Sequence, residues 1–209
     1  MRLSSTQRQF LLRATQQYAL EIGLAESYLA TRGLSVEEAT TFHLGVVEDP
    51  LPGHEKFAGR LAIPYITPTG IVDIRFRSIN GEEPKYMGMP GAQTTMFNVS
   101  ACFNAVKYIC VTEGEMDCIT LSVKTGHPVV GIPGANSWKP QYTRILDDYD
   151  MVILLADGDK AGSDFGKQVA RELPNATVLP MPDGEDVNSV IVSLGKEWID
   201  ERIRTCITS

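Results

Sequence analysis

Acidic residues follow two predicted β-strands at the point where each strand ends. Glu113 comes just after the apolar run 108–111, and Asp157 and Asp159 come after the run 151–155. Each acidic cluster contains a glycine, which lets the backbone turn away from the strand. Because the carboxyl ends of parallel strands meet at one edge of a sheet, we expect these carboxylates to lie close together. Carboxylate oxygens are hard ligands, so the sequence predicts a site for Mg²⁺ or Mn²⁺ rather than zinc.

Two further acidic residues extend this set: Asp117, soon after Glu113, and Asp186, beyond the last predicted strand. Divalent ions on such carboxylates can activate a hydroxyl, neutralise phosphate oxygens and align an in-line displacement. An isolated Asp-x-Asp or Glu-Gly-x-x-Asp is weak evidence, because both also occur in dehalogenase-like phosphatases, glycosyltransferases and plain loops. Their combination at successive strand ends, with a third acidic cluster, is strong evidence for a metal site.

The elements that position these carboxylates alternate between strand-like and helical patterns. The strand-like runs are 107–112, 128–132, 151–156 and 176–180. The helical segments are roughly 116–125, 137–147 and 160–172, with two short ones within 187–205. This alternation predicts an α/β domain with a parallel sheet and flanking helices.

The first half of the chain follows a different pattern. Apolar residues recur at three- or four-residue steps from Phe10 to Ala25, which is typical of helices. From about residue 57 the period changes to two, and the runs 60–66 and 71–77 predict a β-hairpin. We therefore expect a smaller α+β subdomain over 1–104, followed by the parallel-sheet domain over 105–209.

The carboxylate pattern resembles the Toprim domain of bacterial-type primases, topoisomerases, certain nucleases and the RecR repair protein. That domain is Rossmann-like, and the resemblance covers about residues 105–195. The motifs look most similar to the primase branch. They read Thr112-Glu113-Gly114-Glu115-Met116-Asp117 and Ala156-Asp157-Gly158-Asp159-Lys160-Ala161-Gly162.

The first half independently resembles the start of the DnaG-type primase catalytic core. Its motifs follow the family's order along the chain. They read Tyr28-Leu29-x-x-Arg32-Gly33-Leu34, Phe42-x-Leu44-Gly45, Arg60-Leu61-x-Ile63-Pro64 and Pro84-Lys85-Tyr86-Met87-x-Met89-Pro90-Gly91. The whole chain is thus similar to a minimal, phage-like primase core.

The resemblance implies a role for each carboxylate. Glu113 would act as the general base or shape the metal site. Asp157 and Asp159 would hold the catalytic Mg²⁺ or Mn²⁺ ions, and Asp117 and Asp186 would support them.

The resemblance also implies contacts with template or nucleotide phosphates. The residues expected to make them are Arg60, Arg75, Arg77, Lys85 and Lys160. Three of these have alternative interpretations. Lys85 can be an ordinary solvated lysine after a loop, Arg60 can cap the edge of the sheet, and Arg75 is equally compatible with a structural role.

The chain departs from the family in its last acidic cluster. DnaG enzymes often have Asp-Pro-Asp there, whereas this chain reads Asp186-Val187-Asn188, which leaves open whether Asn188 takes part in metal binding. The family's preceding zinc module and following helicase-related part are not among these residues. The expected partners are therefore a separate zinc-binding module and/or a replicative helicase, besides single-stranded DNA and ribonucleoside triphosphates.

The composition is that of a globular, acidic protein, with 209 residues, 43% of them hydrophobic, and a net charge of -7. No stretch approaches the roughly 20 apolar residues of a membrane span. The N-terminus has no signal-peptide pattern and the four cysteines have no zinc-ligand spacing, so we expect a cytoplasmic protein. Most of the acidic excess lies after residue 106, which predicts weak, salt-sensitive binding to bare DNA.

Three functions are consistent with this sequence. The leading hypothesis is a primase that makes short RNA primers on single-stranded DNA by metal-dependent nucleotidyl transfer. The second is a Toprim-type nuclease, because the same metal site can hydrolyse a phosphodiester. The third is a non-catalytic DNA-binding or assembly module of a replisome, against which the intact Glu113, Asp157 and Asp159 argue modestly.

Overall fold

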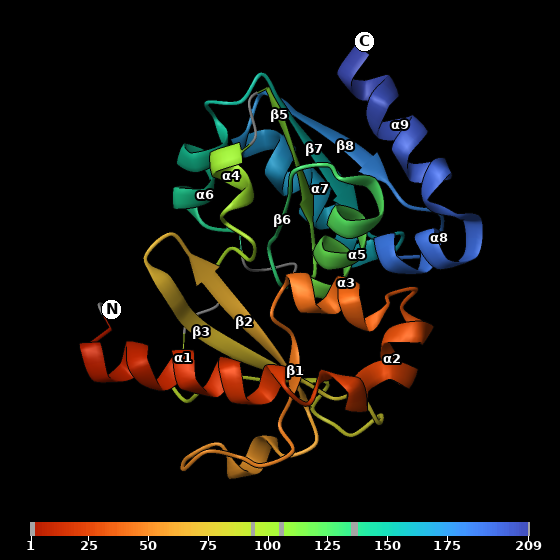
Figure 1. The fold of residues 1–209 in the computed structure, drawn as a ribbon. Helices are drawn as coiled ribbons and strands as arrows, with labels where there is room; N and C mark the ends of the chain where they lie inside the picture. The colour runs from red at the N-terminus through yellow and green to blue at the C-terminus, as the bar shows by residue number, and fades with distance from the viewer. Residues whose placement is uncertain (1–2, 93–94, 105–106, 135–137, 209) are drawn as a thin grey trace. The chain divides into compact units, whose positions relative to one another are not determined.

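The computed structural model describes residues 3–92, 95–104, 107–134 and 138–208. The chain folds as two compact units, residues 1–93 and 94–209 (Figure 1). The boundary expected between residues 104 and 105 adjoins residues 105–106, which lie outside the described ones, and it stays a prediction.

The first unit combines helices with an antiparallel sheet in the order β1-β2-β3-β4. Its helices are α1 (Ser5–Ala19), η1 (Ile22–Ala25), α2 (Glu26–Thr31), α3 (Val36–Thr41) and η2 (Glu55–Phe57). Its strands are β1 (Gly45–Val46), β2 (Leu61–Thr67), β3 (Gly70–Arg77) and β4 (Tyr86–Met87). The predicted hairpin is β2 and β3, with Ala62 paired to Phe76, and an α+β fold is confirmed.

The core of the first unit lies between α1 and the sheet. Leu11, Ala14 and Tyr18 share the buried face of α1, as their spacing predicts, and they pack in one core with Ile74 and Phe76 of β3. A Ser4 capping box starts α1, since the Ser4 hydroxyl accepts from the Gln7 backbone and the Gln7 side chain accepts from the Ser4 backbone.

The second unit is a parallel sheet in the order β6-β5-β7-β8 with helices around it. Its strands are β5 (Tyr108–Thr112), β6 (Val129–Gly131), β7 (Met151–Ala156) and β8 (Ala176–Pro180). Its helices are α4 (Ala101–Asn104), α5 (Glu115–Thr125), α6 (Pro140–Leu146), α7 (Lys160–Glu172), α8 (Val187–Leu194) and α9 (Lys196–Thr208). The predicted α/β architecture is confirmed. The expected start of the α6 segment, residue 137, lies outside the described residues.

The helices of this unit cover both faces of the sheet. On one face, α4, α6 and α7 pack against Ile109 and Val111 of β5 and against Val152 and Leu154 of β7. On the other face, α5 contacts β5 and β6, and α9 contacts β7 and β8. Helix α8 lies beside both α5 and α9. Burial on both faces explains why β5, β6 and β7 are largely apolar runs without polar alternation.

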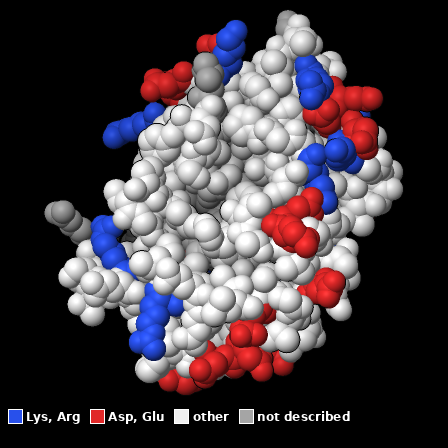
Figure 2. Space-filling model, viewed as in Figure 1, with Lys and Arg blue, Asp and Glu red and all other residues white. Residues whose placement is uncertain are grey.

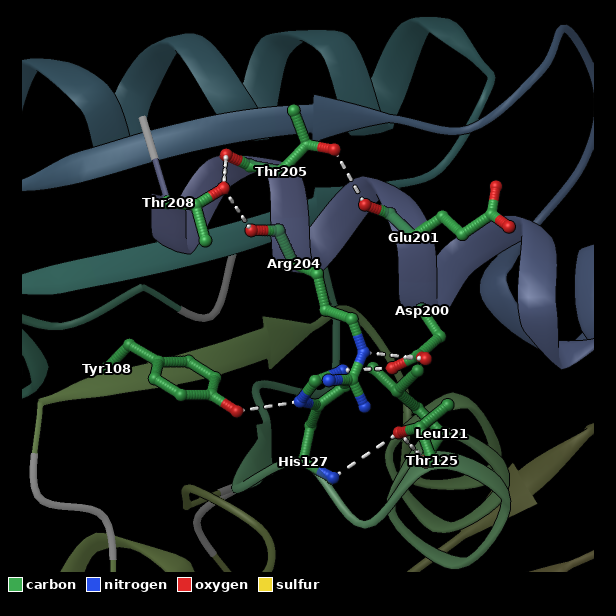
Figure 3. A network of polar contacts seen from close by, with 9 residues as sticks. All are labelled: Tyr108, Leu121, Thr125, His127, Asp200, Glu201, Arg204, Thr205 and Thr208. Carbon is green, nitrogen blue, oxygen red and sulfur yellow. Dashed lines mark hydrogen bonds and ion pairs between the residues drawn. The ribbon is translucent and has the colours of Figure 1, made fainter.

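A polar network ties α9 to the starting ends of the strands (Figure 3). His127 Nδ1 lies 2.7 Å from Tyr108 Oη, and His127 Nε2 lies 2.8 Å from Asp200 Oδ1. Since the Asp200 carboxylate can only accept, Nε2 carries the proton and Nδ1 accepts from the Tyr108 hydroxyl. Asp200 also pairs with Arg204 at 2.8 Å, and acidic and basic side chains are mixed along α9 (Figure 2). Within the described residues, no helix is long and apolar enough to cross a membrane.

Candidate metal centre and nucleic-acid surface

The predicted carboxylates of the second unit follow the carboxyl ends of three neighbouring parallel strands. Strand β5 ends one residue before Glu113, and β7 ends one residue before Asp157. The third, β8, runs parallel beside β7, with Ala156 paired to Pro180, and is followed by the loop that leads to Asp186. We call Glu113, Asp117, Asp157, Asp159 and Asp186 the carboxylate cluster.

Backbone amides hold Glu113 and Asp159 in place. Glu113 Oε1 accepts from the Asp157 N–H at 2.9 Å, which joins the ends of β5 and β7 directly. Asp159 is the N-cap of α7, where its Oδ1 accepts from the Gly162 N–H at 2.8 Å. A side-chain oxygen at an N-cap satisfies a backbone donor that the helix cannot, so the sequence itself favours this placement of Asp159.

Two other members of the cluster hold the start of α8. Asp186 is the N-cap of that helix, and its Oδ1 accepts from the Ser189 N–H at 2.7 Å. Asp117, on α5, accepts from the Asn188 N–H through Oδ1 at 3.0 Å. Asp117 is buried, whereas Asp186 is half-buried. Two carboxylates from different elements thus meet at one helix end.

Asp157 differs from the other four members of the carboxylate cluster in its hydrogen bonding. Its Oδ1 is buried and has no hydrogen-bond partner. Burial, together with nearby negative charges, raises the pKa of Asp157 to about 8. The negative charges that add to this shift, the largest first, are those of Asp117, Glu113, Asp186 and Asp159. Each of the other four members of the carboxylate cluster thus contributes to the electrostatic environment of Asp157.

Glu113 is affected in the same direction. Burial raises its pKa above the usual value for a glutamate, the hydrogen bond from Asp157 opposes the shift, and the charges of Asp159 and Asp117 add to it. A carboxylate whose pKa is raised is a better base near neutral pH. Glu113 is therefore suited to accept a proton as well as to bind a metal ion.

The donor set fits a hard divalent cation. Among the described residues, no three His, Cys, Asp or Glu side chains already converge as a metal-binding group. The cluster is nevertheless all oxygen, and it includes a buried carboxylate oxygen at Asp157 with no protein donor. A divalent cation would satisfy that oxygen and offset the repulsion among the carboxylates. Mg²⁺ and Mn²⁺ are the ions that such ligands prefer.

Two glycines let the loops of the site approach each other, and the sequence motifs alone did not indicate their packing role. A Cβ at Gly158 would lie 1.8 Å from the Pro182 carbonyl oxygen. The two loops are joined there, since Gly158 N–H donates to Glu185 and Gly184 N–H donates to Gly158. A Cβ at Gly162 would lie 2.8 Å from Glu113 Oε1. Both glycines stand inside the sequence motifs, but only the folded chain shows which atoms their missing side chains make room for.

Four of the five predicted phosphate-binding residues lie in the first unit, in three different environments. Arg60 and Arg77 are buried, each with only 5% of its surface exposed, and Arg60 Nη1 donates to the Pro84 carbonyl at 2.8 Å. Arg75 is half-buried, and Lys85 is exposed. Arg60 thus makes a hydrogen bond within the first unit, to the segment just before β4. The fifth residue, Lys160, is exposed at the first turn of α7, next to Asp159.

Aromatic rings accompany the arginines of β3. The Arg77 guanidinium lies 4.9 Å from the centre of the Tyr86 ring and 5.6 Å from that of Tyr28, and it also donates to the Tyr86 hydroxyl. Arg75 lies 4.6 Å from the Tyr86 ring. Arg32 lies 5.6 Å from the Tyr28 ring. Tyr28 and Tyr86 occur in the sequence motifs, but only the folded chain identifies them as the partners of the arginines.

Comparison with known proteins agrees with this architecture. A family described as Toprim-like matches residues 110–191, which contain the whole carboxylate cluster. The chain is 43% identical to the Gene 57 protein of Mycobacterium phage D29 over 152 residues, which cover 70% of this chain and 99% of that protein. It is 27% identical to the DNA primase of Buchnera aphidicola over 173 residues, which cover 74% of this chain and 30% of the primase.

Solved structures extend the fold comparison to nearly the whole chain. A DnaG catalytic core has a TM-score of 0.79 at 21% identity, covering 95% of this chain and 79% of that one. A DnaG primase catalytic domain bound to single-stranded DNA has a TM-score of 0.78 at 22% identity, covering 97% and 80%. The zinc-binding and RNA polymerase domains of the Aquifex aeolicus primase have a TM-score of 0.76 at 22% identity, covering 98% of this chain and 62% of that one.

The fold and the carboxylate cluster together define a class, a Toprim domain within a catalytic core of the DnaG primase type. The chain belongs to the same family as the Gene 57 protein of Mycobacterium phage D29, and it is also related to bacterial DNA primases. It spans about a third of the length of the DNA primases that it matches.

Proposed function

We propose that this protein synthesises short RNA primers on single-stranded DNA by metal-dependent nucleotidyl transfer. The observation that carries the proposal is the buried, unpartnered Oδ1 of Asp157, which is exposed to the negative charges of four other carboxylates. Such a site favours a divalent cation, and its scaffold is that of the DnaG catalytic core. A relative with this fold has been solved with single-stranded DNA, which supports the same template here.

The carboxylates divide into two groups in this proposal. Asp157 and Asp159 would hold Mg²⁺ or Mn²⁺, with Asp117 and Asp186 supporting them. When bound, the cation supplies positive charge for the triphosphate oxygens and lowers the pKa of a hydroxyl. Each supporting carboxylate already has one oxygen committed to a backbone N–H, which orients it in advance.

Glu113 is the proposed proton acceptor. The 3′-hydroxyl of one ribonucleotide attacks the α-phosphorus of the next, a new P–O bond forms, and pyrophosphate leaves with the electrons of the broken bond. The hydroxyl proton passes to the Glu113 carboxylate, whose Oε1 is held by the Asp157 N–H and whose Oε2 is the other available acceptor. The raised pKa of Glu113 suits this task.

The proposed template and nucleotide contacts come from the basic residues. Lys85 and Lys160 are exposed and would make phosphate contacts directly. Arg75 and Arg77 lie against Tyr86, whose ring limits the orientations of their guanidinium groups. A separate zinc-binding module is a proposed partner, since an Aquifex aeolicus primase with this fold combines such a domain with its polymerase domain.

A priming assay tests the proposal. Purified protein is incubated with Mg²⁺ or Mn²⁺, ribonucleoside triphosphates and single-stranded DNA, with and without a candidate zinc-binding partner from the same genome. We expect oligoribonucleotides that are absent with Glu113→Gln. Absence of product with every partner tested would overturn the proposal. Degradation of labelled DNA without nucleotides would instead support the nuclease alternative.

A further inference from the structure

Asn188 occupies the position where the family often has its last acidic ligand, and its side chain is committed elsewhere. Only 2% of its surface is exposed. Its Nδ2 donates to the Thr120 hydroxyl at 2.7 Å, and its backbone N–H donates to Asp117 Oδ1 at 3.0 Å. Asn188 therefore makes two buried hydrogen bonds to α5.

The two acceptors lie on the same face of α5. Asp117 and Thr120 are three residues apart, so they are neighbours on the helix surface. Thr120 is fully buried, and Asp117 is buried as well. Asn188 lies in the first turn of α8. One face of α5 thus holds the start of α8 through a main-chain and a side-chain hydrogen bond.

This junction also determines where Asp186 lies. Asp186 is the N-cap of α8, and its side chain is bound to the first turn of that helix through Ser189. A shift of the α8 N-terminus would therefore move Asp186 and remove the donor that orients Asp117. Two of the five cluster carboxylates depend on the same junction between α5 and α8.

An acidic residue at position 188 would not suit this environment. A carboxylate there would be buried beside Asp117, and a buried charge without a partner is destabilising. The asparagine amide can donate to Thr120 without adding charge. This chain has an asparagine where the family's Asp-x-Asp pattern has its second aspartate. The Thr120 hydroxyl is the acceptor for the hydrogen bond that the asparagine amide donates.

We propose that Asn188 is a positioning residue that ties α8 to α5 through Thr120, and that it is not a metal ligand. The proposal rests on the proposed metal-dependent function, because its consequence is the placement of Asp117 and Asp186 for a divalent cation. Outer hydrogen-bond partners of this kind typically change metal affinity by about 10- to 100-fold when they are removed.

The test uses the full chain and two readouts that do not require activity. Thermal unfolding in EDTA measures the junction alone, and Mn²⁺ titration followed by electron paramagnetic resonance measures ion affinity. The variants are Asn188→Ala, Thr120→Val and the double variant. The controls are Thr120→Ser, which keeps the hydroxyl, and Ser193→Ala, which removes an exposed hydroxyl elsewhere on α8.

We expect Thr120→Val and Asn188→Ala to lower the unfolding temperature in EDTA, with a non-additive double variant. We also expect each to weaken Mn²⁺ binding by about 10-fold, while both controls stay close to the wild type. Weakened Mn²⁺ binding in Asn188→Ala with none in Thr120→Val would assign Asn188 as a ligand and overturn the proposal. Additive effects on unfolding would also overturn it.

The same experiment separates this proposal from the proposed function. If the wild type fails to bind Mn²⁺, the metal-dependent function fails, whereas unfolding in EDTA still tests the junction. If Asn188→Ala fails to fold, Thr120→Val supplies the decisive comparison, because valine nearly preserves the shape of threonine and removes only the hydroxyl. Tighter Mn²⁺ binding by Asn188→Asp than by the wild type would also contradict the proposal.

Discussion

The backbone N–H of Asp157 donates to Oε1 of Glu113 at 2.9 Å, although the two residues are 44 positions apart. The bond orients the Glu113 carboxylate and holds it against the backbone of Asp157, whose side-chain Oδ1 is buried. It depends on the parallel pairing of β5 with β7, in which Val111 lies opposite Leu154. The pairing of these two strands thus determines, through one hydrogen bond, where the carboxylate of the proposed proton acceptor Glu113 lies.

Replacing Asp157 by asparagine should separate stability from metal binding. The asparagine removes a buried, repelled charge, so we expect a higher unfolding temperature in EDTA at a pH of about 8.5, above the pKa of Asp157. It also removes a proposed ligand, so Mn²⁺ should no longer stabilise the protein. A ligand at about 100 times its Kd stabilises the wild type by about 2.7 kcal/mol. Calorimetry with and without Mn²⁺ checks both effects, and stabilisation by Mn²⁺ that persists in the variant would contradict the assignment.

The stability of the metal-free protein should depend on pH through Asp157. Its pKa is about 8 in the folded chain, against the ordinary value of 3.8 for an aspartate. Between these values the folded state keeps a proton that the unfolded state has lost, so stability falls as pH rises from about 4 to about 8. Glu113 shifts in the same direction. Urea unfolding in EDTA should show a shallower pH dependence in Asp157→Asn than in the wild type, and equal slopes would refute this origin.

Alanine at Gly158 should disrupt the loops of the carboxylate cluster. The added Cβ would lie 1.8 Å from the Pro182 carbonyl oxygen, so the loops after β7 and β8 must separate. Overpacking of this kind typically costs about 1–3 kcal/mol. We expect a lower unfolding temperature and weaker Mn²⁺ binding. Gly23→Ala is the matched control, because no atom lies within 4 Å of its Cβ, and a Gly158→Ala protein that matched it would contradict the close packing.

Substitution of Asp200 should destabilise the fold without affecting the metal site. His127 and Tyr108 lie at the starting ends of the strands, opposite the carboxylate cluster, and His127 loses its acceptor in Asp200→Ala (Figure 3). An unsatisfied buried donor costs about 1–3 kcal/mol. Arg204→Ala, which removes only a largely exposed ion-pair partner, should lower stability much less than Asp200→Ala. Urea unfolding and Mn²⁺ titration check this, and equal losses in the two variants would contradict the role of His127.

Lys85→Ala should weaken nucleic-acid binding without loss of stability. Lys85 is exposed, so its removal leaves the core intact. For single strands, removal of one phosphate-binding cation should reduce the slope of log K against log salt by about 0.7. Fluorescence anisotropy with single-stranded DNA at several salt concentrations measures the slope. Asn80→Ala, in the preceding loop, is a neutral control, and an unchanged slope in Lys85→Ala would exclude an interaction between Lys85 and a phosphate.

Much of the architecture follows from local sequence patterns. Short apolar runs predict β5, β7 and β8, and helical spacing predicts α1 and α5, because these patterns reflect local backbone geometry. The carboxylate cluster follows from the rule that parallel strands end at one edge. The placement of Asp159 at an N-cap depends on neighbouring residues alone, so it is also readable from the sequence.

Only the tertiary structure decides which groups the site residues contact. The sequence determines that Glu113 and Asp157 end two strands, but only the register of β5 on β7 brings the Asp157 N–H to Glu113. Asn188 meets Thr120 only because α8 packs on α5, 68 positions away in the chain. Burial likewise raises the pKa of Asp157 to about 8, and no local pattern encodes it. Contacts over such separations depend on how whole elements pack, whereas sequence periodicity reports only which residues share a face.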